Sequence, residues 1–242
     1  MPAPLILIPP SEAKREGGRR RAPVGAFNDD LADARAYVLD HLRELVEGAS
    51  TAELSSVLGV RGPLLERARE ATVALVEGRA RVMPAWQRYS GVVWSHLEPE
   101  TLSASARRRL IVPSGLYGLN AGDDPIADFR LKMSARLGEG SLAAWWRPVL
   151  GASLARHARG RVVYDLLPLE HRAALSSMAL GPRLVSVTFR HGGNGRLAGH
   201  DAKAAKGAFA RHLALNEPPT SFTWGRWSAY ERGGSLEVLY EA

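Results

Sequence analysis

The hydrophobic positions of this chain form short apolar runs that alternate with longer amphipathic stretches. Apolar runs bounded by proline, glycine or charged residues are typical of buried strands. Such runs occupy residues 4–8, 110–112, 161–167 and 184–189. Residues 129–133 alternate between apolar and basic side chains and predict another strand, whereas residues 92–94 indicate a strand or a buried turn. Two adjacent glycines separate the last two apolar runs, residues 227–230 and 236–240, and predict a hairpin.

Apolar residues spaced three and four apart predict helices between these strands. Three helices follow one another between residues 31 and 80, where Ser50 or Thr51 is suited to cap the second and Pro63 to open the third. Further helices are expected at residues 101–109, 142–150, 171–180 and 202–215.

Strands and helices are interleaved without a strict β–α–β order, so we predict an α+β (mixed α/β) fold. In this prediction residues 1–242 form a single compact domain with a central mixed sheet and a C-terminal hairpin. Residues 31–80 form a helical, helix-hairpin-helix-like insertion in it.

The chain contains no cysteine among its 242 residues. Disulfides, zinc–thiolate sites, iron–sulfur clusters and thiol-based redox chemistry are therefore excluded. The seven histidines show no metal-binding spacing, so we expect neither a metal nor a cofactor. Residues 193–198 match a dinucleotide-binding glycine pattern, but Gly199 and His200 interrupt the helix that this motif needs. We interpret this segment as a glycine-rich hairpin.

The formal net charge is +7, from 32 Lys+Arg against 25 Asp+Glu. A basic surplus favours an anionic partner, which leaves DNA, RNA, nucleotides and phosphorylated metabolites open. Only four of the basic residues are lysines, so drift toward arginine in a GC-rich genome is an alternative source of the surplus. No apolar run approaches the roughly 20 residues of a membrane helix, and no basic segment precedes residues 5–8. We expect a cytoplasmic protein without a membrane partner.

Polar residues follow three of the predicted strands. Ligands of interleaved α/β folds bind beyond the carboxyl ends of strands, so these residues and several basic ones are expected to meet in one cleft. The catalytic candidates are Glu12, Lys14, Ser114, Tyr117 and Asp165. The anion-binding candidates are Lys14, Arg130, Lys203, Lys206 and Arg211.

Each candidate has an expected role in that cleft. Arg130 is suited to grip a phosphate or carboxylate with two hydrogen bonds, Lys14 to stabilise charge, and Glu12 or Asp165 to act as acid or base. The alternatives are that Ser114 and Asp165 serve only in turns or caps. A solvated helix face is likewise the alternative for residues 203–211, although small residues between the lysines favour an enclosed helix.

The turn after the second predicted helix is a candidate DNA contact. Gly59, Arg61 and Gly62 lie between two amphipathic helices, and glycines in such a turn let backbone amides meet a phosphate. These glycines are three residues apart, whereas the usual helix-hairpin-helix turn has them two apart. An ordinary turn between helices is the alternative.

Five blocks, in order along the chain, are similar to those of the YaaA family of peroxide-stress proteins. The blocks are residues 7–14, 89–93, 114–118, 128–133 and 202–207. Ala13 stands where the family commonly has glycine, and Phe129 where it usually has tyrosine. The resemblance implies a single mixed fold, a cytoplasmic location, a role in hydrogen peroxide defence and DNA binding through a helix-hairpin-helix element.

Two functions have support in the sequence, and a third, an interaction protein that controls iron availability through a partner, has no sequence feature in its favour. The first is a peroxide-stress protein that binds DNA, without sequence preference, or another polyanion and limits damage by iron and peroxide. The second is an enzyme that acts on a nucleobase, a nucleotide or a similar anionic small molecule in the basic cleft.

Overall fold

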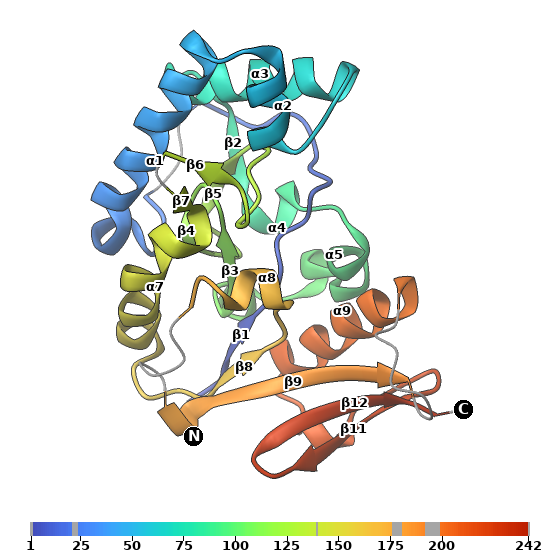
Figure 1. Cartoon of the computed structure of the whole chain (residues 1–242). Helices are drawn as coiled ribbons and strands as arrows, with labels where there is room; N and C mark the ends of the chain where they lie inside the picture. Colours follow the sequence, from blue (N-terminus) through green and yellow to red (C-terminus); the bar gives the residue numbers. More distant parts are fainter. Residues whose placement is uncertain (1, 21–23, 139, 176–180, 192–198, 242) are drawn as a thin grey trace.

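The centre of the computed structural model is an eight-stranded mixed sheet (Figure 1). The structure describes residues 2–20, 24–138, 140–175, 181–191 and 199–241. The strands are hydrogen-bonded in the order β10-β11-β12-β9-β8-β1-β3-β4. Their bounds are β1 Leu5–Leu7, β3 Leu110–Ser114, β4 Gly118–Ala121, β8 Val163–Asp165, β9 Leu184–His191, β10 Thr223–Trp224, β11 Trp227–Arg232 and β12 Ser235–Tyr240.

Strands β9, β8, β1 and β3 run parallel to one another in the middle of this sheet. Every residue of β1 and β3 is buried, which explains why these strands are apolar throughout rather than alternating. The predicted hairpin is confirmed by the antiparallel pair of β11 and β12. Its turn residues Gly233 and Gly234 have φ values of 54° and 77°, as a type I′ turn requires.

Long and short helices surround the sheet. The described helices are α1 Asn28–Gly48, α2 Thr51–Leu58, α3 Pro63–Val76, α4 Ala85–Arg88, α5 Val92–Leu97, α6 Ala104–Arg107, α7 Leu142–Ala158, α8 Leu169–Arg172 and α9 His200–Ala214. Two small antiparallel pairs complete the fold: β2 Val82–Pro84 with β5 Pro125–Ala127, and β6 Arg136–Leu137 with β7 Gly140–Ser141. This arrangement confirms the predicted α+β class.

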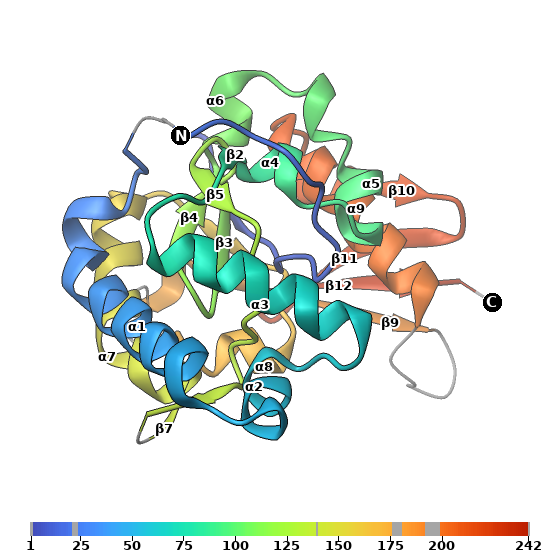
Figure 2. The ribbon, with the colours of Figure 1, turned by 90° about the horizontal axis from the view of Figure 1, so that it is seen from above.

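Helices α1, α2 and α3 form a group at one end of the molecule, and the C-terminal hairpin lies at the other end (Figure 1). Viewed from above, α3 crosses in front of the sheet (Figure 2). Ser50 caps α2 through a reciprocal pair of hydrogen bonds with Glu53, and Pro63 begins α3 as expected. Leu54 and Leu58 of α2 pack on Leu65 of α3 in a small separate core.

Two predictions are wrong: the strand or buried turn at residues 92–94 and the strand at residues 129–133. Residues 92–94 belong to helix α5, because Val93, Trp94 and Leu97 form a buried helical face. Burial alternates along residues 129–133 as expected, but this segment is irregular and belongs to no strand among the described residues. It crosses Gly115 instead, where a Cβ atom would lie 2.7 Å from the Leu131 carbonyl oxygen.

Three predicted helices differ in extent. Helix α7 continues to Ala158, beyond the expected end at residue 150. Residues 99–101 form a 3₁₀ turn and α6 spans only Ala104–Arg107 of the expected helix at 101–109. Helix α8 covers Leu169–Arg172, and residues 176–180 lie outside the described residues, as does the glycine-rich segment 193–198.

Candidate functional site

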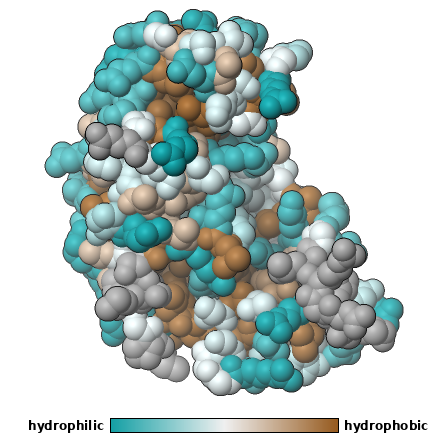
Figure 3. All heavy atoms as spheres, viewed as in Figure 1, coloured by the Kyte–Doolittle hydropathy of each residue, from teal (hydrophilic) through white to brown (hydrophobic). Residues whose placement is uncertain are grey.

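A cavity of about 550 Å³ opens beyond the carboxyl ends of β1, β3 and β8. Its lining comes from the loop after β1, the end of β3, segment 129–133, α5, α8 and α9. On the face shown in Figure 3, apolar residues are seen largely in recesses between polar ones. Six of the candidate residues line this cavity: Glu12, Lys14, Ser114, Arg130, Lys203 and Lys206.

Lys14 reaches the cavity from the loop after β1. Its Nζ donates a hydrogen bond to the Ser11 carbonyl oxygen at 2.9 Å and lies 4.3 Å from the centre of the Phe129 ring. Burial lowers the pKa of Lys14 to about 8, and the carboxylates of Asp128 and Glu12 oppose that shift. The Phe129 ring attracts the ammonium through its face. This contact does not use the hydroxyl of the tyrosine that is usual in the family at this position.

Lys206 reaches the same cavity from α9. Its Nζ donates to the Leu166 carbonyl oxygen at 2.6 Å and lies 5.4 Å from the centre of the Phe189 ring. Burial lowers the pKa of Lys206 to about 8, and the nearby Arg172 guanidinium adds to the effect. Lys203, one turn earlier on the helix, lines the cavity but is exposed.

Glu12 balances part of the positive charge. One carboxylate oxygen lies 3.1 Å from Lys132 Nζ and the other 3.6 Å from an Arg130 nitrogen. The contact with Lys132 lowers the pKa of Glu12, so this carboxylate is ionised at neutral pH and cannot donate a proton as an acid. An incoming anion would compete with Glu12 for the two cations.

Asp165, Tyr117 and Arg211 are placed outside the cavity lining. Asp165 is buried beneath it and accepts a hydrogen bond from Arg172 Nε at 2.7 Å; burial raises the pKa of its carboxyl and Arg172 opposes the rise. The Tyr117 hydroxyl accepts the Ala127 amide at 2.9 Å. Arg211 lies on another face of α9 and donates to Thr101 Oγ1 and the Glu98 carbonyl oxygen. These three residues are therefore held by protein partners.

Sequence reasoning did not single out His171. This residue lines the cavity, and its Nδ1 is buried without a hydrogen-bond partner among the described residues. Burial lowers the pKa of His171, and the positive charge of Lys206 adds to the shift. Because its pKa is lowered, the imidazole is mainly neutral at neutral pH. A lone histidine in a predicted helix carries no sequence signal for this placement.

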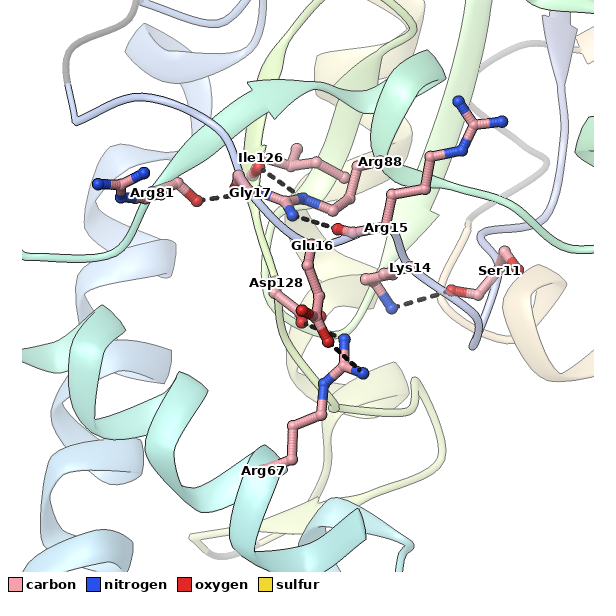
Figure 4. Close-up of polar contacts among 10 residues, drawn as sticks. All are labelled: Ser11, Lys14, Arg15, Glu16, Gly17, Arg67, Arg81, Arg88, Ile126 and Asp128. Carbon is pink, nitrogen blue, oxygen red and sulfur yellow. Dashed lines mark hydrogen bonds and ion pairs between the residues drawn. The ribbon is translucent and has the colours of Figure 1, made fainter.

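The loop after β1 is held in place by Arg88, a buried residue of α4 (Figure 4). Its guanidinium donates to the carbonyl oxygens of Arg15, Gly17 and Arg81. Arg67 of α3 adds ion pairs to Glu16 at 2.9 Å and Asp128 at 3.0 Å.

The turn between α2 and α3 adjoins the cavity. Gly59 and Gly62 have φ values of 66° and 58°, which favour glycine, and Arg61 is exposed between them. Leu58 lines the cavity, and a Cβ atom at Gly59 would lie 3.5 Å from the Lys132 side chain. Within the described part of the chain the amides of Arg61 and Gly62 donate no hydrogen bond, so both are available to a ligand.

Two features that the described residues lack bear on other classes of site. No group of three or more His, Asp or Glu side chains is arranged to hold a metal ion there. None of the helices in these residues has the length and apolar character needed to cross a membrane.

Comparison with known proteins identifies the family. The family model of the peroxide stress protein YaaA matches residues 5–222. A UPF0246 protein of Streptomyces coelicolor is 34% identical over 218 residues, covering 86% of this chain and 82% of that protein. A UPF0246 protein of Corynebacterium glutamicum is 32% identical over 226 residues (88% and 86%), and one of Corynebacterium efficiens is 30% identical over 245 residues (97% and 94%). The chain therefore belongs to the peroxide stress protein YaaA family.

Proposed function

We propose that this protein binds DNA without sequence preference through the α2–α3 turn and the adjoining cavity rim. In this proposal the bound DNA is shielded from damage by iron and peroxide in the cytoplasm. The observation that carries the proposal is the contact of the turn with the cavity, where Gly59 lies beside Lys132. A nucleic-acid backbone that contacts the turn would meet the cationic rim next.

The turn has the chemistry of a phosphate site. Two unpaired amides, at Arg61 and Gly62, lie at the N-terminal end of α3, where the helix dipole favours an anion. Gly62 has open space where its Cβ would be, so a phosphate can approach the backbone closely. Backbone amides of this kind contact phosphate groups rather than bases. DNA binding is therefore expected to be insensitive to DNA sequence and steeply dependent on salt concentration.

A second candidate function is an enzyme acting on a nucleobase, a nucleotide or a similar anionic small molecule. The observation that favours it is the convergence of six polar candidates in a cavity of about 550 Å³. That volume matches a site for a small molecule and is too small for a duplex. The two functions are compatible, because the rim and the interior present different groups.

The test is a titration with duplex DNA at two salt concentrations, with mononucleotides as competitors. Arg61→Glu is expected to weaken duplex binding by about tenfold at low salt and to reduce the slope of log K against log salt by about one. Arg226 is exposed between β10 and β11, and β11 lies at the end of the molecule opposite α1, α2 and α3 (Figure 1). Arg226→Glu makes the same charge change there and is the matched control. Equal affinities of the two variants would refute the role of the turn.

The same titration distinguishes the second candidate function, an enzyme acting in the cavity, from DNA binding at the turn. Saturable binding of mononucleotides that is lost on Arg130→Ala, in the absence of duplex binding, would make the cavity interior the functional site. Duplex binding that mononucleotides do not displace would favour the rim and the turn.

A further inference from the structure

The lysines of this chain are distributed differently from its arginines. Only four of the 32 basic residues are lysines: Lys14, Lys132, Lys203 and Lys206. All four line the single cavity described above, whereas Arg130 is the one arginine of the described residues that does so. Both side chains supply positive charge, but only the lysine amine loses its proton readily enough to act as a nucleophile. The distribution therefore concentrates the amines of this chain in one cavity.

We propose that Lys206 is a nucleophile that forms an imine with the carbonyl carbon of a phosphate-bearing aldehyde or ketone. This inference rests on the proposed function of the cavity and its rim as an anion-binding site, and extends it from binding to covalent chemistry. Lys206 is held on a helix, against the Phe189 ring, with its amine at the cavity wall. An amine desolvated in this way is activated as in other Schiff-base lysines.

Lys206 is better suited to this role than Lys14. Around Lys14 the carboxylates of Asp128 and Glu12 offset the guanidinium groups of Arg130 and Arg88. Around Lys206 the cations Arg172 and Lys203 face one carboxylate, Asp165. Asp165 is already paired with Arg172, at 2.7 Å. Lys206 therefore lies in a net positive environment, which favours the neutral amine at a pH near 8.

The other groups of the cavity have complementary roles. Lys14, Arg130 and Lys132 supply the positive charge that would hold the phosphate of the substrate. His171, whose ring lines the same cavity as Lys206, supplies a proton acceptor.

The reaction balances without an oxidant or a reductant. The lone pair of the neutral Lys206 amine attacks the carbonyl carbon, and the carbonyl oxygen takes up a proton to give a carbinolamine. Loss of water then forms the C=N bond. In this scheme His171, whose ring lines the same cavity, carries the proton released from nitrogen to the carbonyl oxygen during the addition. A second proton, taken from solvent, leaves with the hydroxyl as water, so that one water and one protonated imine are produced.

Two sources supply this substrate chemistry. One is the ring-opened sugar of an abasic site in DNA, an aldehyde flanked by phosphates; the other is a free sugar phosphate. The test incubates the full-length protein with sodium cyanoborohydride and, in separate arms, a duplex with one abasic site or glyceraldehyde 3-phosphate. Peptide mass mapping then locates the reduced adduct.

An adduct on Lys206 in either arm is the expected result, and the arm that gives it identifies the source. A surface lysine introduced by Arg226→Lys controls for non-specific labelling and is expected to stay unmodified. Lys206→Arg keeps the charge and is expected to abolish the adduct, with folding checked by circular dichroism. His171→Gln is expected to slow adduct formation without abolishing it.

The inference is overturned by no adduct in either arm, or by labelling spread evenly over the four lysines and the control lysine. Duplex binding by the wild-type protein, measured alongside, separates this failure from that of the proposed function. Binding without an adduct refutes the imine alone, whereas an adduct with glyceraldehyde 3-phosphate without duplex binding refutes DNA binding alone.

Discussion

The crossing of α5 and α9 makes Gly207 the most informative position for a stability test. A Cβ atom at Gly207 would lie 2.2 Å from the Val93 carbonyl oxygen and 2.9 Å from the Cβ of His96. The first contact is with backbone, which cannot rotate away. Restoring an ordinary separation would require the two helices to part by about 1 Å.

Two opposing effects decide the result of Gly207→Ala. Alanine is favoured over glycine within a helix by about 1 kcal/mol. Overpacking of a well-packed contact costs about 1–3 kcal/mol, and more when the clash is with backbone. The contact at 2.2 Å is far shorter than a normal separation, so we expect the cost of the clash to exceed the gain in helix propensity. The free energy of unfolding should then fall by about 1–2 kcal/mol.

The assay is urea denaturation of Gly207→Ala beside Gly48→Ala. Gly48 is the last residue of α1 and has no atom within 4 Å of its Cβ position, so alanine there is expected to be neutral or stabilising. Helix α9 also carries Lys206, so Gly207→Ala should reduce imine trapping as well. A Gly207→Ala protein as stable as the wild type, or more stable, would refute the argument from close approach.

Two further predictions follow from buried charge. Arg88→Met leaves several loop carbonyl oxygens without their donor, so the free energy of unfolding is expected to fall by about 3 kcal/mol or more in chemical denaturation. Arg43→Met, which removes an exposed ion pair, is the control and is expected to cost less than about 1 kcal/mol. Equal losses in the two variants would contradict this prediction. The pKa of Lys206 falls from 10.5 to about 8 on folding, so the unfolded chain binds more protons between these values. The free energy of unfolding of the wild type, minus that of Lys206→Met, should therefore rise by on the order of 1–3 kcal/mol between pH 8 and 10.5. A difference that does not change with pH would refute the lowered pKa.

The sequence predicted well where local pattern and packing agree. The buried strands around Ile6 and Val112 are apolar throughout because the sheet is covered on both faces. The polar residues that follow these strands reach one cavity because the ends of adjacent parallel strands lie together. Periodicity and strand-end position were sufficient for both predictions.

The sequence predicted poorly where tertiary contacts decide. Segment 129–133 has the alternation of a strand but no strand beside it, because its backbone crosses Gly115. Asp165 lies at a strand end but is paired with Arg172, which precedes β9 and gave no sequence signal. His171 is distinguished only by an unpaired buried nitrogen, which depends on every neighbour and not on any motif.

The small residues of α9 connect the sequence to the chemistry most directly. Ala204, Ala205 and Gly207 are buried, so this helix packs closely on its neighbours and carries Lys206 to the cavity wall, where its side chain is half-buried. Lys203, one turn away, stays exposed. The same spacing of lysines on a helix with large side chains would hold both amines in solvent, protonated and unreactive. The combination of small residues with a lysine is therefore a stronger indicator of a reactive amine than a basic motif alone.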